Sequence, residues 1–135
     1  MHLIVDGANV MGSRPDGWWR DRAGAASRLA EQLAGALGRG ALDELLAGQP
    51  GASRVVLVLE GKARRATPPA DPPDGFEIVL APADGDSTII ELAQDLVSRG
   101  EDVLVVTADR ELTRRLHAVG ARTIRPGRLL KLLQE

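Results

Sequence analysis

Three aspartates each follow a short apolar segment of the sequence, and this repeated placement is typical of a metal-binding site. They are Asp6 after residues 3–5, Asp86 after residues 76–80 and Asp109 after residues 102–107. If the apolar segments are neighbouring parallel strands, their carboxyl ends lie at one edge of a sheet, where open α/β folds bind ligands. We therefore expect the three carboxylates to converge, with Asn9 beside the first of them.

Carboxylates that converge in this way favour a divalent cation. Each close pair of like charges costs roughly 1 kcal/mol or more even at a high effective dielectric. A cation removes that cost, activates water and neutralises the charge that develops on a phosphate in the transition state. We expect Asp6, Asp86 and Asp109 to bind the metal and cleave RNA, with Asn9 positioning a ligand or the phosphate.

Each acidic residue also has a purely structural interpretation. Asp86 and Asp109 could be helix N-caps, which contribute about 1 kcal/mol each, and Asp6 before Gly7 could form an ordinary Asx turn. It is the combination at three strand ends that favours a functional site. Asp84 and Glu60 stay open, because each could bind in the outer part of the site or be solvated.

Basic and aromatic residues follow the same strand ends. The candidates for RNA contact are Arg14, Trp18, Arg20, Lys62, Arg64 and Arg110. A basic rim around an acidic centre would hold a polyanionic backbone while one phosphate meets the metal. One tryptophan of the Trp18-Trp19 pair could stack on unpaired bases, although tryptophans more often pack beneath a helix.

Composition narrows the chemistry further. The 135 residues have 44% hydrophobic content and a net charge of −2, which excludes a globally basic nucleic-acid binder. There is no cysteine and there are only two histidines, so the metal would be hard and oxygen-bound, such as Mg²⁺ or Mn²⁺. No signal-peptide pattern and no apolar run of ~20 residues is present, so we expect a cytoplasmic protein without a membrane span.

The elements that must position these residues alternate along the chain. We expect strands at 3–5, 54–60, 76–80, 102–107 and 121–124, and loops at 10–19 and 61–75. Helices are expected through residues 26–37, around Leu42 to Leu46 with an end at 48–51, from Asp86 to Gly100, at 109–118 and at 126–133. Asp16 or Asp21 would cap the first helix. The pattern predicts a single domain, residues 1–135, with a three-layer α/β fold and a parallel sheet.

Three motifs resemble a known family. They are Ile4-Val5-Asp6-Gly7-Ala8-Asn9-Val10, Gly85-Asp86-Ser87-Thr88-Ile89-Ile90 and Val106-Thr107-Ala108-Asp109-Arg110-Glu111-Leu112. In this order they are similar to the NYN branch of the PIN-like nuclease superfamily, especially its bacterial YacP-like members. The similarity extends over nearly the whole chain.

The resemblance implies strand order 3-2-1-4-5 and endoribonuclease activity with Mg²⁺ or Mn²⁺. The acidic positions of the family fall on Asp6, Asp86 and Asp109, and its asparagine on Asn9. Thr107 matches a small hydroxyl position near the metal, and Ser87 lies in the second motif, where it would support the ligands. Members of the family often carry two adjacent acidic residues in the second motif, whereas Gly85 separates Asp84 from Asp86 in this chain, so the assignment of Asp84 stays open. Members also tend to have an aspartate where this chain has Glu60.

Other α/β families fit less well. A haloacid-dehalogenase-type phosphatase needs a second acid where this chain has Ala8, and a response-regulator receiver needs a lysine near Arg125. No glycine-rich phosphate loop is present. The remaining competitor is a catalytically silent PIN-like module that binds RNA or a partner protein. Whether the chain forms a homodimer is left open by the sequence.

Overall fold

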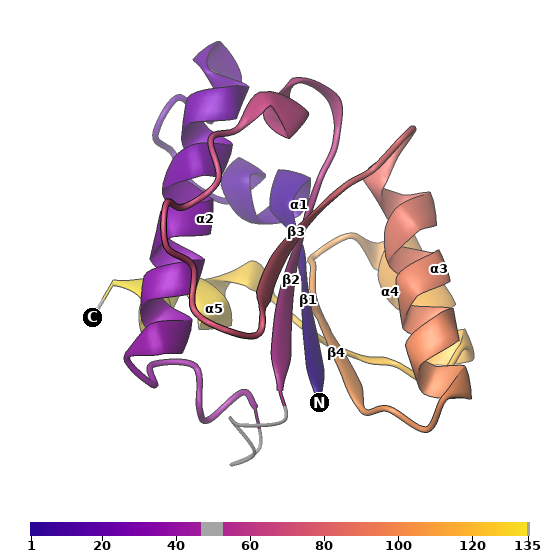
Figure 1. Ribbon diagram of the computed structural model, residues 1–135. Helices are drawn as coiled ribbons and strands as arrows, with labels where there is room; N and C mark the ends of the chain where they lie inside the picture. The colour runs from indigo at the N-terminus through magenta and orange to yellow at the C-terminus, as the bar shows by residue number, and fades with distance from the viewer. Residues whose placement is uncertain (47–52, 135) are drawn as a thin grey trace.

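The computed structural model describes residues 1–46 and 53–134, in which strands and helices alternate (Figure 1). The strands are β1 (His2–Asp6), β2 (Arg54–Leu59), β3 (Phe76–Leu80), β4 (Val103–Val106) and β5 (Arg122–Ile124). The α-helices are α1 (Gly7–Gly12), α2 (Arg22–Gly38), α3 (Gly85–Ser98), α4 (Arg110–Ala118) and α5 (Pro126–Leu133). Two short 3₁₀ helices are η1 (Trp18–Arg20) and η3 (Gly61–Arg65).

All five strands are parallel and lie in the order β3-β2-β1-β4-β5, as expected. The chain adds strands on one side of β1 and then returns to add β4 and β5 on the other side. The strand order therefore reverses between β1 and β4, where Val5 pairs with Val106. Ligands of open parallel sheets bind outside the carboxyl ends of the strands at such a reversal.

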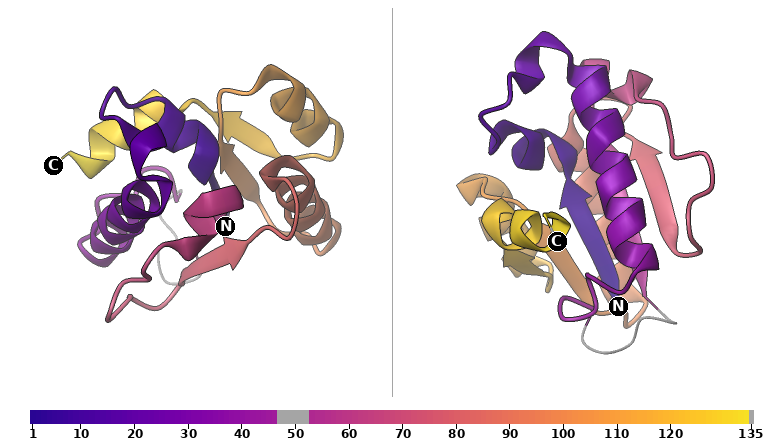
Figure 2. Two further views of the ribbon diagram at one scale, coloured as in Figure 1. Left: turned by 90° about the horizontal axis from the view of Figure 1, so that it is seen from above. Right: turned by 90° about the vertical axis from the view of Figure 1, so that its left-hand side faces the viewer.

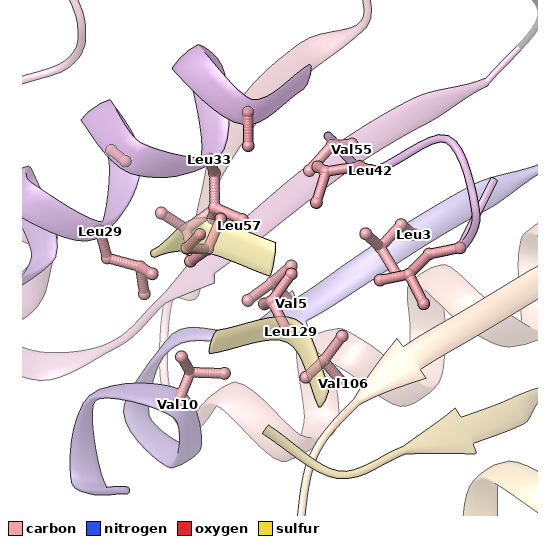
Figure 3. Packing of buried hydrophobic residues seen from close by; sticks show 14 of the residues in the cluster. Leu3, Val5, Val10, Leu29, Leu33, Leu42, Val55, Leu57, Val106 and Leu129 are labelled. Carbon is pink, nitrogen blue, oxygen red and sulfur yellow. The ribbon is translucent and has the colours of Figure 1, made fainter. Parts of the chain in front are cut away.

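Helices cover both faces of the sheet, which gives three layers (Figure 2). Alternate residues of each strand point to opposite faces. On one face Leu3, Val5 and Leu57 pack against α1, α2 and α5 (Figure 3). On the other face Ile4 and Val56 pack against α3 and α4. Burial on both faces explains why the central strands are apolar without alternation.

The loop expected at 10–19 was predicted to begin too early, because residues 10–12 are helical. Helix α1 begins at Gly7, directly after β1, and buries Val10 and Met11. Gly7 permits this because a Cβ there would lie only 2.6 Å from the carbonyl oxygen of Val58, so no other residue allows so close an approach to β2. Asp6, for which an Asx turn was the structural alternative, is therefore the N-cap of a helix.

Other expected boundaries also change. Residues 41–46 form hydrogen-bonded turns instead of the expected helix, and Leu42 and Leu46 are fully buried. The end expected at 48–51 lies outside the described residues. The expected loop at 61–75 opens with η3, whose Ala63 is buried. Helix α2 is capped by Asp21, as one of the two alternatives predicted. Among the described residues, no helix is long and apolar enough to cross a membrane.

Candidate functional site

Asp6 is the most deeply placed acidic residue at the carboxyl edge of the sheet. It ends β1 and is only 5% exposed. Its side chain caps α1 by accepting a hydrogen bond from the backbone N–H of Asn9 at 3.3 Å, and it accepts a second from the Thr107 hydroxyl at 3.0 Å. Burial raises the pKa of Asp6 to about 6, and repulsion from Asp86 and Glu60 adds to that rise, whereas the two hydrogen bonds oppose it. The protein therefore holds a carboxylate where its charge is disfavoured.

The turn after β4 fixes Asp6 and Asn9 in place. The Thr107 hydroxyl that donates to Asp6 also accepts from the backbone N–H of Asp109 at 3.2 Å. The side-chain oxygen of Asn9 accepts from the N–H of Ala108 at 2.8 Å. Residues about a hundred positions apart in sequence are thus joined across the point where the strand order reverses. The oxygen of Asn9 is occupied, while its side-chain nitrogen makes no hydrogen bond with the described residues and stays available to a ligand.

Helices α3 and α4 present two further carboxylates to this edge. Asp109 is the N-cap of α4 and accepts from the N–H of Leu112 through one oxygen. Asp86 lies inside the first turn of α3 and makes no hydrogen bond or ion pair with the residues that the structure describes. Burial raises the pKa of Asp86, and the charges of Asp109, Glu60 and Asp84 raise it further, whereas the charge of Arg115 opposes the rise. These two aspartates are therefore electrostatic neighbours, and Asp86 has both oxygens unengaged.

The structure distinguishes Asp84 from Asp86. The N-cap of α3 is Asp84, not Asp86, and both of its oxygens accept hydrogen bonds from Ser87, one from the backbone at 2.8 Å and one from the hydroxyl at 3.0 Å. These bonds lower the pKa of Asp84. The two predicted residues Asp84 and Ser87 thus satisfy each other at the helix start.

Glu60 connects the end of β2 to the start of α3. Its carboxylate accepts from the N–H of Gly85 at 2.8 Å. A Cβ on Gly85 would lie 3.3 Å from that carboxylate, so glycine allows the close contact. Glu60 also contributes to the raised pKa of both Asp6 and Asp86, which places its charge within the acidic cluster.

The donor chemistry of this cluster suits Mg²⁺ or Mn²⁺, but the side chains are not arranged as a finished site. Hard divalent cations take carboxylate and carbonyl oxygens, and Asp6, Asp86 and Asp109 offer such oxygens from three different elements. Among residues 1–46 and 53–134, however, no three acidic or histidine side chains stand close enough to hold an ion. Binding would therefore require the aspartates to move toward one another.

The predicted basic residues lie on several sides of the cluster. Lys62 and Arg64 of η3 line a hollow of about 450 Å³ beside β3, and Arg110 lines another beside β5. Arg14 donates to Gln32 of α2 at 2.8 Å. The guanidinium of Arg20 lies 5.9 Å from the ring centre of Trp19. Lys62 and Arg64 thus lie on the β3 side and Arg110 on the β5 side, whereas the contacts of Arg14 and Arg20 are with α2 and η1.

The two tryptophans have different environments. Trp18 packs against the core and lines a hollow of about 530 Å³ together with Glu60 and Asp84, with the Arg22 guanidinium 5.4 Å from its ring centre. Trp19 is 56% exposed. The sequence favoured Trp18 for RNA contact, whereas the structure leaves the ring of Trp19 more accessible to a base.

Two basic residues at this edge were missed from the sequence. Arg125 directly follows β5, and Arg128 lies in the first turn of α5, and both line the same hollow as Arg110. The rule that carboxyl ends of parallel strands share one edge could have indicated Arg125, had it been applied to β5.

Comparison with known proteins identifies the fold. No family model matches the sequence, and no curated protein matches it. The crystal structure of Rae1 (YacP) from Bacillus subtilis is similar, with a TM-score of 0.70 and 20% sequence identity over 99% of this chain and 74% of that one. A tryptophan-to-leucine variant of the same protein has a TM-score of 0.66 at the same identity and coverage. The chain therefore has a YacP-like fold.

Proposed function

We propose that this protein is a metal-dependent endoribonuclease that cleaves single-stranded RNA with Mg²⁺ or Mn²⁺. The observation that carries the proposal is Asp6, a carboxylate that is only 5% exposed at the reversal of strand order. Its charge is disfavoured by burial and by Asp86, so a cation at this position would relieve both. The YacP-like fold and the three motifs that resemble the NYN branch support the same conclusion.

The residues of the chain have distinct roles in this proposal. Asp6, Asp86 and Asp109 would hold the metal, which when bound supplies an activated water and neutralises charge on the phosphate. Thr107 keeps the Asp6 carboxylate in one orientation. The unengaged amide nitrogen of Asn9 can donate to a phosphate oxygen.

The basic residues would hold the RNA strand across this centre. Arg110 lies next to Asp109 in sequence and is exposed, so it can reach a neighbouring phosphate. Guanidinium groups match phosphate oxygens in pairs. Lys62 and Arg64 on the β3 side would hold the strand farther from the cleaved bond.

The proposal is tested by incubating purified protein with labelled RNA and DNA of the same sequence in Mn²⁺, with and without chelator. We expect cleavage of single-stranded RNA that stops on chelation and that Asp109→Asn abolishes. Asparagine also caps helices well, so this variant should fold normally. Cleavage by Asp109→Asn at the wild-type rate would remove Asp109 from the site, and no cleavage by the wild type would contradict the proposal.

A second candidate is a silent module that binds RNA without cutting it. The observation that favours it is that no three acidic or histidine side chains in the described part of the chain surround an ion position. A Mn²⁺ titration distinguishes the endoribonuclease from the silent module. It compares the rise in the thermal unfolding midpoint of the wild type with that of Asp86→Asn. A silent module would show no stabilisation that depends on Asp86, and its RNA affinity would survive the substitution.

A further inference from the structure

A hollow of about 550 Å³ adjoins the acidic cluster on the β5 side. Its lining includes Thr107 and Ala108 after β4, and the three arginines Arg110, Arg125 and Arg128. Thr107 and Ala108 are the residues that hydrogen-bond to Asp6 and Asn9. The hollow therefore lies beside the residues that hold Asp6 and Asn9 in place.

The lining of this hollow is positively charged and contains no acidic side chain that would neutralise it. Three arginines contribute to the lining and no acidic residue does. The side chains of Arg110 and Arg125 make no hydrogen bond or ion pair with the residues that the structure describes. Arg128 has one distant pair, at 3.9 Å to Glu44, in which both side chains are more than 60% exposed. Exposed pairs of this kind contribute little.

Helix stability does not explain these arginines. Arg110 is the first residue of α4, Arg125 is the N-cap of α5 without a capping bond, and Arg128 lies in the first turn of α5. Positive charge at a helix N-terminus is unfavourable, whereas an anion there is favoured. The same helix α4 carries Arg114, which pairs with Glu111. Of the arginines that line the hollow, Arg110 and Arg125 are thus left without an ion pair among the described residues.

We propose that this arginine-lined hollow binds a backbone phosphate of the RNA, beside the phosphate that meets the acidic cluster. The inference rests on the proposed function and deepens it, because it directs the strand from the cluster toward β5. The planar guanidinium group presents several N–H donors that match two phosphate oxygens. Thr107 both lines the hollow and donates to Asp6, so the two sites adjoin at this residue, an arrangement compatible with neighbouring phosphates of one strand.

The test measures binding without cleavage. Fluorescence anisotropy of a labelled single-stranded RNA is recorded in chelator, at several salt concentrations, for the wild type and for Arg110→Gln/Arg125→Gln. We expect about tenfold weaker binding at low salt for the variant. Each phosphate contact on single-stranded nucleic acid contributes roughly −0.7 to the slope of log K against log salt, so the slope should become shallower by about 1.4.

The matched control is Arg54→Gln/Arg99→Gln, which removes the same charge at the opposite edge of the sheet, at the start of β2 and the end of α3. We expect wild-type affinity and slope for this control. An unchanged slope in Arg110→Gln/Arg125→Gln, or an equal change in the control, would overturn the inference. Arg110 and Arg125 are exposed and unpaired, so Arg110→Gln/Arg125→Gln should keep the wild-type unfolding midpoint. If this double variant is less stable, the single variant Arg125→Gln repeats the test, with an expected slope change of about 0.7.

Competitors identify the source of the phosphate. Inorganic phosphate and an oligoglutamate peptide, each added at the charge concentration of an unlabelled RNA competitor, should displace the labelled RNA far less than that competitor does. Equal displacement by either would overturn assignment to an RNA backbone. The binding assay contains chelator and does not depend on cleavage. A wild type that fails to cleave RNA in Mn²⁺ would therefore contradict the proposed enzyme without changing the result of the binding assay.

Discussion

The two edges of the sheet differ in how their charged side chains are paired. At the amino edge, Arg122 at the start of β5 pairs with Asp102 at 3.2 Å, and Arg99 pairs with Asp95 at the end of α3. At the carboxyl edge Asp86 and the side chain of Arg125 form no ion pair with the described residues, although the charge of Arg115 partly opposes the raised pKa of Asp86. The acidic group and the basic group lie side by side there and are not neutralised by each other.

We propose that the paired charges of the amino edge stabilise the fold and that the unpaired charges of the carboxyl edge bind ligands. The charge of Asp86 raises the pKa of Asp6, and the charge of Asp109 raises the pKa of Asp86, so folding is less favourable when Asp6 and Asp86 are ionised. A fold selected for stability alone would pair them, as the amino edge does. The unpaired charges of the carboxyl edge therefore support the proposed partners, a cation for the acids and phosphates for the arginines.

Among the variants that compare the two edges, the largest effect is expected from Asp86→Asn, which removes one charge from the carboxyl edge. Loss of supporting residues around a metal typically costs 10–100-fold in activity, so loss of a ligand should reduce RNA cleavage by at least about 100-fold. The measurement is the initial rate of RNA cleavage in Mn²⁺. Asp95→Asn in the same helix is the matched control, and it should cleave at the wild-type rate. Equal rates for the two variants would show that the edges do not differ.

The pH dependence of stability should sharpen the contrast. The folded-state pKa of Asp6 is raised from 3.8 to about 6, so the folded protein binds a proton more readily than the unfolded chain between these pH values. Stability without metal should therefore fall as pH rises from about 4 to 6, by up to roughly 3 kcal/mol. Urea unfolding in chelator measures this fall, which should be lost in Asp6→Asn. A fall of the same size in that variant would assign it to other groups.

Thr107→Val tests how the carboxyl edge holds its buried acid. Valine leaves the Asp6 oxygen and the Asp109 N–H without the hydroxyl that joins them, and an unsatisfied buried polar group costs about 1–3 kcal/mol. We expect that loss in the free energy of unfolding at pH 7, together with slower cleavage. Thr67→Val is the control, because the side chain of Thr67 is exposed and makes no hydrogen bond within the described residues. A loss below 0.5 kcal/mol for Thr107→Val would contradict the role of the hydroxyl.

The smallest effect is expected at the amino edge itself. Arg122→Gln breaks a pair whose side chains are both 58% exposed, and exposed pairs contribute about 0–1 kcal/mol. Chemical denaturation should show a change in that range, and the rate of RNA cleavage should not change. A loss of activity in Arg122→Gln would mean that the paired edge is also functional.

The sequence predicted the strands and the positions of the acidic residues because both follow from local patterns. Apolar runs locate buried strands, and parallel strands bring Asp6 and Asp109 to one edge regardless of packing detail. The start of α1 at Gly7 could not be predicted, since it depends on a close approach to the Val58 carbonyl across the sheet. The functions of Asp84 and Asp86 depend on the residue at which α3 begins, and a shift of two residues exchanges cap and free carboxylate.

The basic residues show the same limit. Arg110 was predicted from its position beside Asp109, but Arg125 and Arg128 join it only because α5 starts next to α4 across the end of β5. Which of Trp18 and Trp19 is exposed depends on the turn of η1 against α2, and adjacent identical residues carry no signal that distinguishes them.

A Mn²⁺ titration followed by isothermal calorimetry tests the central claim most directly, namely that the unpaired carboxylates of the carboxyl edge hold a divalent cation. The wild type should bind Mn²⁺ and release protons at pH 6, where Asp6 is partly protonated. Asp86→Asn should bind much more weakly, and Asp95→Asn should bind as the wild type does. Wild-type protein that takes up no Mn²⁺, or Asp86→Asn that binds it equally well, would contradict the claim.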